Sequence, residues 1–167
     1  MILSFVLLGM TVGLRSMTAM AVLCWFAWAQ LLPQHGWSFW VGSLVSAIVF
    51  TVFALGEYVV DTLPKTPSRT APGPLIVRIV FGGLVGALAA HAVIEPAVGG
   101  AIFGVIGALI GAFGGVRVRM YWAKSWGKDL PVALLESAVA LGLAVGACWQ
   151  LHGLLKSILS SLPYAAQ

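Results

Sequence analysis

The sequence predicts an all-α membrane protein, and three observations lead to this fold class. Of the 167 residues, 60% are hydrophobic and 8% are charged, and the mean hydropathy is +1.02. Soluble domains usually carry about 25% charged residues, so this chain has too few polar groups to cover a water-facing surface. Several apolar stretches approach or exceed the ~18 residues that cross a bilayer core. Backbone groups in lipid must be paired internally, and the alternation typical of barrel strands is not seen, so these stretches are expected to be helices.

Five apolar segments are predicted to span the membrane, within a single domain over residues 1–167. They are 16–33, 38–57, 75–94, 98–116 and 132–152. A helix over residues 2–14 measures only ~20 Å, and an unbroken helix over 2–33 would measure ~48 Å, too long for a modest tilt. We therefore expect a helix break at Arg15, which makes residues 2–14 either a short sixth span or a re-entrant half-helix.

Basic residues are concentrated at one side of the predicted spans. Eight of the nine lie at Arg15, in 61–78 and in 117–130, whereas the opposite connections at 34–37 and 91–99 contain none. The positive-inside rule places the basic segments in the cytoplasm, and five or six spans alternate consistently with that orientation. Topology thus accounts for the positive charge, and no nucleic-acid-binding motif accompanies it.

Two glutamates lie inside apolar sequence and are candidate functional residues. Glu57 stands near the inner end of its span, shortly before Asp61, and Glu136 is followed by SAVALGLAVGACW. A charge near the centre of a membrane helix costs ~2.5–3.5 kcal/mol, so each carboxylate needs a cation or a proton. Arg15 is the expected partner, with Arg117 as second choice. These residues either form an ion pair that fixes helix register or line a polar cavity, in which Glu136 is the candidate proton carrier.

The segment 61–74 is rich in proline and carries groups that suit an anion. Proline fixes its own φ and restricts the preceding residue, so this connection is stiff. Basic and hydroxyl side chains together recognise phosphate or carboxylate, and lipid headgroups are an available source. The candidate contacts are Lys65, Ser68, Arg69 and Arg78. A rigid connector that only signals topology is an equally good interpretation.

A glycine-rich stretch at 99–115 predicts close helix packing, because glycines four residues apart let a second backbone approach. The glycines concerned are Gly100, Gly104, Gly107, Gly111 and Gly115. The segment 75–94, which has small residues of its own, is the expected partner inside the protein. A homodimer seam is the alternative.

A second pattern suggests a diverged internal repeat. LGMTVGLRSM at 8–17 aligns with IGAFGGVRVR at 110–119, which places Arg15 on Arg117, and each element is followed by a glutamate in an apolar stretch. Repeat halves of about 1–60 and 98–155 would suit a transporter, since transporter sites often lie between such repeats. Chance similarity between glycine-rich membrane helices is the other explanation.

The sequence contains no Ser-His-Asp order, HExxH motif or P-loop, so we expect neither an enzyme nor a cofactor. His91 and Glu95 are four residues apart, which puts them on one side of a helix and makes them weak metal candidates. Solvated interfacial residues are the simpler explanation for this pair.

GLRSMT at 13–18, followed by GEYVVDTLPKTPSR from residue 56, resembles small bacterial integral membrane proteins of domain-of-unknown-function family 4126. The family pattern is a GLRS-type motif followed by G-E-x3-D-x-L-P-x2-P-x-R. Here those positions are Gly13 to Ser16, and then Gly56, Glu57, Asp61, Leu63, Pro64, Pro67 and Arg69. Ala19 and Thr62 depart from the family's proline and lysine. The resemblance covers most of the chain and implies a bacterial inner-membrane location, but no activity.

Two classes of function therefore remain in view. One is a transporter or carrier for a small anion, a proton-coupled solute or an anionic lipid headgroup, for which the buried charges and the broken first helix are typical. The other is a non-catalytic scaffold or assembly factor that packs through its glycine-rich helices. Membrane lipids are the expected partners in both cases.

Overall fold

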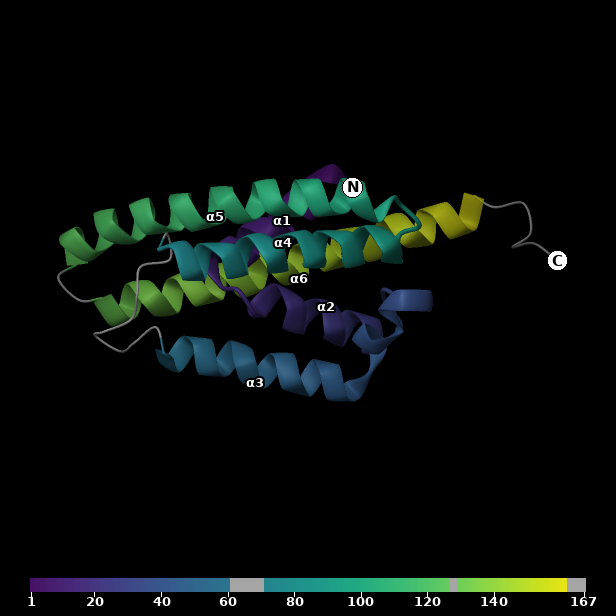
Figure 1. Cartoon of the computed structure of the whole chain (residues 1–167), viewed down its shortest axis with the longest axis horizontal. Coiled ribbons are helices and arrows are strands. Elements are labelled where there is room, and N and C mark those ends of the chain that lie inside the picture. The colour runs from purple at the N-terminus through teal and green to yellow at the C-terminus, as the bar shows by residue number, and fades with distance from the viewer. Residues whose placement is uncertain (61–70, 127–128, 162–167) are drawn as a thin grey trace.

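The computed structural model describes residues 1–60, 71–126 and 129–161, which form six α-helices and one short 3-10 helix. In chain order these are α1 (Ile2–Leu14), α2 (Thr18–Trp28), η1 (Gly36–Gly42), α3 (Leu44–Val60), α4 (Pro72–Ala92), α5 (Ala97–Trp126) and α6 (Asp129–Ser161) (Figure 1). Three of them, α4, α5 and α6, contain stretches long and apolar enough to cross a membrane. A fourth candidate is the pair η1 and α3, bent by 64° at its junction. The all-α membrane class is confirmed.

Among the described residues, three helices, or four if the bent pair is one span, are long and apolar enough to cross a membrane, so the five to six predicted spans are not confirmed. At 1.5 Å per residue, α1 and α2 are ~20 Å and ~16 Å long, short of the ~30 Å hydrocarbon core. The predicted span 16–33 contains only α2, because the chain leaves the helix after Trp28 and Gln30 adopts a φ of +58°. This left-handed conformation ends an α-helix. The predicted spans 98–116 and 132–152 lie within α5 and α6, which both continue further.

The expected helix break at Arg15 is confirmed. Arg15 is extended, with φ −142° and ψ 109°, and α2 begins at Thr18. Figure 1 shows α1 and α2 running in opposite directions, so the two short helices form a hairpin whose tip is at Arg15. Helix α1 is the inner one and packs against α4, α5 and α6, whereas α2 packs mainly against α3, α6 and η1. The tip of the hairpin therefore lies inside protein, where Arg15 is 1% exposed.

Glycines explain how closely α1 and α4 approach α5. A Cβ added at Gly104 of α5 would overlap the carbonyl oxygen of Gly82 on α4, and one at Gly111 would overlap the carbonyl oxygen of Met10 on α1. Only a residue without a side chain permits such backbone contact. Of the two packing alternatives, the structure thus shows α4 and α5 together inside one chain. A homodimer seam stays a prediction.

The helix bundle has two different ends, one with basic residues and the other with exposed tryptophans. The C-terminal ends of α3 and α5 and the N-terminal ends of α4 and α6 lie together, at the left of Figure 1. Arg117 and Arg119 lie in the part of α5 nearest this end. At the other end lie η1 and exposed tryptophans, among them Trp28 and Trp37.

The internal repeat stays a prediction. Helix α1 ends before Arg15, whereas α5 continues without interruption through Arg117. The two aligned arginines therefore occupy different local structures.

Candidate functional site

The break between α1 and α2 exposes backbone groups that need partners. The last carbonyls and first N–H groups of a helix have no partner within it. Here they include the carbonyls of Val12 and Gly13 at the end of α1, and the N–H groups of Ser16 and Met17 before α2. Val12 and Ser16 are buried, so water cannot be their main partner. Side chains from other helices must supply the missing hydrogen bonds.

Arg78 and Glu57 supply them. Arg78, on α4, donates from Nη1 to the carbonyl oxygens of Val12, at 3.3 Å, and Gly13. Glu57, on α3, accepts from the N–H groups of Ser16, at 2.8 Å, and Met17, at 3.0 Å. A cation at a helix C-terminus and an anion at a helix N-terminus both match the helix dipole. Arg78 Nη2 and Glu57 Oε1 also lie 3.9 Å apart, so the two side chains form an ion pair.

Arg15 binds elsewhere in the same cluster. Its Nη2 donates to the carbonyl oxygen of Ala133 on α6, at 3.4 Å. Its guanidinium carbon lies 4.9 Å from the ring centroid of Tyr58, within the range of a cation–π interaction. The Tyr58 hydroxyl is hydrogen-bonded to Thr18 at 3.0 Å. The cluster thus joins the hairpin tip to α3, α4 and α6.

The ion pair differs from the one expected from the sequence. Glu57 meets Arg78 and not Arg15, and Arg78 is 4% exposed inside α4 instead of forming part of a headgroup-binding loop. Arg117, the second expected partner, is exposed on α5. The other predicted members, Asp61, Lys65, Ser68 and Arg69, lie outside the described residues. Arg15, Glu57 and Arg78 each make hydrogen bonds to backbone groups, and Glu57 and Arg78 bind the hairpin tip directly, so we call this cluster the clamp.

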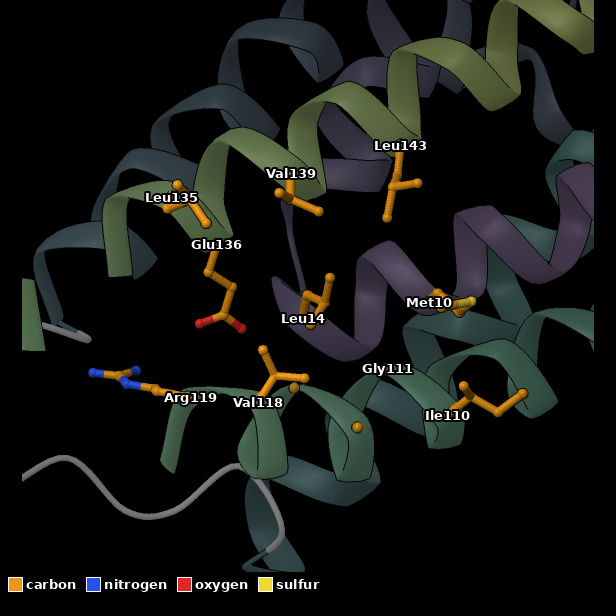
Figure 2. Close-up of a pocket in the computed structure, with 12 residues that line it drawn as sticks. Met10, Leu14, Ile110, Gly111, Val118, Arg119, Leu135, Glu136, Val139 and Leu143 are labelled. Carbon is orange, nitrogen blue, oxygen red and sulfur yellow. The ribbon is translucent and has the colours of Figure 1, made fainter. Parts of the chain in front are cut away.

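Glu136 lies in a different place, at a pocket between α1, α5 and α6. The pocket has a volume of about 320 Å³ and is walled almost entirely by apolar side chains and glycines. The lining residues are Met10, Leu14, Ile110, Gly111, Gly114, Gly115, Val118, Arg119, Leu135, Glu136, Val139 and Leu143 (Figure 2). Several of these are also half-exposed on the outside of the bundle, such as Ile110, Val118 and Val139. The pocket is therefore a lateral groove that opens on the face expected to meet lipid.

Two charged side chains stand at one end of this groove. Figure 2 shows the Glu136 carboxylate reaching from α6 towards α5, while the Arg119 guanidinium extends from α5 at the same end of the groove. Leu143, Met10 and Ile110 lie towards the opposite end. The groove is thus amphiphilic along its length, with charge nearest the basic end of the molecule.

Arg119 was missed by sequence reasoning, although a signal for it exists. Gly107, Gly111, Gly115 and Arg119 are spaced by four residues, so they follow one face of α5. Arg117 is two positions from Arg119 and therefore points away from that face. Extending the glycine spacing would have selected Arg119 as the groove residue.

His91, one of the two weak metal candidates, contacts other residues. The His91 ring lies 5.4 Å from the Trp37 ring, and its Nε2 is 3.1 Å from the carbonyl oxygen of His35. Within the described ranges, no group of three or more His, Cys, Asp or Glu side chains is arranged to hold a metal ion. His91 thus ties α4 to the segment before η1.

Comparison with protein-family models, with curated proteins and with solved structures found no match to this chain. The resemblance to family 4126 therefore stays a prediction, carried by the motifs at 13–18 and 56–69.

Proposed function

We propose that this protein is a lipid-binding membrane protein, a carrier that takes a lipid from the bilayer into the groove between α5 and α6. The observation that carries the proposal is the groove itself, with apolar walls along its length and Glu136 and Arg119 at one end. A small ion requires polar groups around it, since burial of an unpaired charge is costly. An amphiphile instead needs an apolar channel with charge at one end, which is the arrangement described here.

The groove also has a route for such a ligand. Exposed Ile110 and Val139 flank it on α5 and α6, so a lipid could enter sideways without leaving the hydrophobic layer. Helix α5 can leave this space because glycines 111, 114 and 115 contribute no side chain to the wall. The volume lies at the lower end of the ~300–1,000 Å³ of small-molecule pockets, which suits one acyl chain.

Orientation and location belong to the same proposal. The basic end of the bundle faces the cytoplasm of a bacterial cell and the chain resides in the inner membrane, in keeping with the positive-inside rule. The bound lipid then comes from the cytoplasmic leaflet, because the charged end of the groove lies at that side.

The proposal is tested by filling the groove. Val139→Trp places a large side chain in the channel, whereas Leu141→Trp puts the same side chain on an exposed α6 position that does not line it. Both variants are purified in mild detergent and their bound lipid is measured by native mass spectrometry. Val139→Trp should lose the bound lipid while Leu141→Trp retains it. Equal lipid retention by the two folded variants would overturn the proposal.

The second candidate function is a non-catalytic scaffold. The clamp at Arg15, Glu57 and Arg78 favours it, because these side chains hold α3, α4 and α6 around the hairpin tip through hydrogen bonds to backbone groups. A scaffold needs no ligand in the groove. Purification with no lipid bound to the unmodified protein would favour this alternative.

A further inference from the structure

We infer that α1 and α2 form a re-entrant hairpin, which enters the membrane from the end of the bundle with exposed tryptophans, stops short of the basic end and is held there by the clamp. From the sequence, residues 2–14 are either a short sixth span or a re-entrant half-helix. The contacts of the hairpin with α3, α4 and α6 decide between these alternatives. This path of the chain is independent of lipid binding in the groove.

Both ends of the hairpin meet α6 at the same level. Ser4, near the start of α1, donates a hydrogen bond from Oγ to Oε1 of Gln150, at 2.9 Å. The carbonyl oxygen of Leu31, shortly after α2, lies 2.7 Å from Nδ1 of His152. Gln150 and His152 are two residues apart on α6, so the chain enters and leaves the hairpin at one level of the bundle.

The tip lies far from this level but does not pass the basic end. Arg15 binds the carbonyl oxygen of Ala133, which is ~26 Å along α6 from the residues that meet the two ends of the hairpin. Arg78 and Glu57, which bind the tip, lie ~9 Å and ~5 Å along their helices from the ends of α4 and α3 at the basic end. The tip therefore stops inside the bundle.

A membrane admits such a turn only where protein surrounds it. Helices of ~20 Å and ~16 Å cannot each cross a hydrocarbon core of ~30 Å. Non-helical backbone at membrane depth is tolerated when it is buried in protein and its polar groups are paired. Arg78 pairs two carbonyl oxygens at the end of α1, and Glu57 pairs two N–H groups before α2. Without these bonds the buried tip would carry unpaired backbone groups, so the clamp is what keeps the hairpin inserted.

Single cysteines in a background without native cysteines test the path of the chain. In spheroplasts, a membrane-impermeant maleimide should label His35→Cys, and added protease should remove an epitope fused before Met1. Ser16→Cys replaces a serine that is 7% exposed, and it should be labelled neither in spheroplasts nor in inside-out vesicles, but should react once the protein is unfolded in SDS. Ser68→Cys is the control for the basic side and should react only in inside-out vesicles. Labelling of Ser16→Cys as fast as Ser68→Cys, or an epitope digested only from the side that labels Ser68→Cys, would overturn the inference.

A second measurement tests the clamp. In purified protein, Glu57→Gln should make Ser16→Cys react roughly tenfold faster or more, because hydrogen bonds to a charged group contribute that much and labelling follows the fraction of molecules with an open tip. Glu95→Gln is the matched control, since it makes the same chemical change in the segment between α4 and α5 and should leave the rate unchanged. Both rates are measured at a temperature at which the variants remain monodisperse. Equal labelling of Ser16→Cys in the two folded variants would show that the clamp does not hold the hairpin and would overturn its role.

Discussion

Replacing Gly104 by alanine is expected to destabilise the protein, although alanine is the better helix former. Gly104 lies where α5 faces α4, and an added Cβ would overlap the carbonyl oxygen of Gly82 and stand 3.1 Å from the Cα of Gly86. Both obstacles are backbone atoms, which cannot rotate away as the end of a flexible side chain can. Helix α4 would therefore have to move away from α5.

The magnitude follows from two opposing contributions. Forcing an extra methyl group into a packed interface typically costs ~1–3 kcal/mol, whereas alanine gains up to ~1 kcal/mol over glycine in helix propensity. Gly146→Ala is the matched control, since Gly146 lies inside α6 and nothing stands within 4 Å of its added Cβ. It keeps the propensity gain without the packing cost. Because both variants have the propensity gain, they should differ by the packing cost alone, ~1–3 kcal/mol in the free energy of unfolding.

Thermal unfolding in mild detergent measures this difference, with the fraction that stays monodisperse after heating as the readout. One kcal/mol corresponds to ~2–4 °C for a chain of this size. Gly104→Ala should therefore melt several degrees below the unmodified protein, and Gly146→Ala at or slightly above it. A melting temperature for Gly104→Ala equal to that of Gly146→Ala would refute the close contact of α4 with α5.

The charged clamp and the orientation lead to three further predictions. Glu57→Gln should lower the free energy of unfolding by ~3–5 kcal/mol, because the amide nitrogen cannot accept an N–H group and the negative charge that faces buried Arg78 is removed; unchanged thermal stability would contradict this. Tyr58→Phe keeps the ring beside Arg15 and loses one hydroxyl hydrogen bond, so the same assay should show a loss of stability of only ~0.5–1.5 kcal/mol. A loss as large as that of Glu57→Gln would contradict this prediction. In a background without native cysteines, a cysteine at Ser68 should react only with a reagent that reaches the cytoplasm and one at His35 with an impermeant external reagent; reaction of both from one side would reverse the orientation.

Much of the fold could be predicted from the sequence, because its cues are local. Apolar composition and segment length are enough to locate α4, α5 and α6, since lipid demands long apolar helices with internal hydrogen bonds. An arginine between two short apolar runs was enough to predict the break before Ser16. Glycines at four-residue spacing were likewise enough to expect α4 against α5, because that spacing defines a helix face regardless of what it meets.

The partners of the charged residues could not be predicted in the same way. Glu57 and Arg78 lie on different helices and meet only because the hairpin tip comes to rest between α3 and α4. Sequence spacing suggested Arg15 as the partner of Glu57. Arg15 instead contacts the Tyr58 ring on α3 and the Ala133 carbonyl on α6.

The sequence by itself determined the class of protein, the long helices and the place of the break, since each depends on neighbouring residues and on the hydrophobicity of the surrounding medium. Only the tertiary structure decided which arginine neutralises Glu57, that α1 and α2 form a buried hairpin, and that Glu136 and Arg119 stand together at one end of an apolar groove. These features depend on the relative positions and rotations of helices remote in sequence. The packing of several helices at once sets those positions, and no local pattern encodes it.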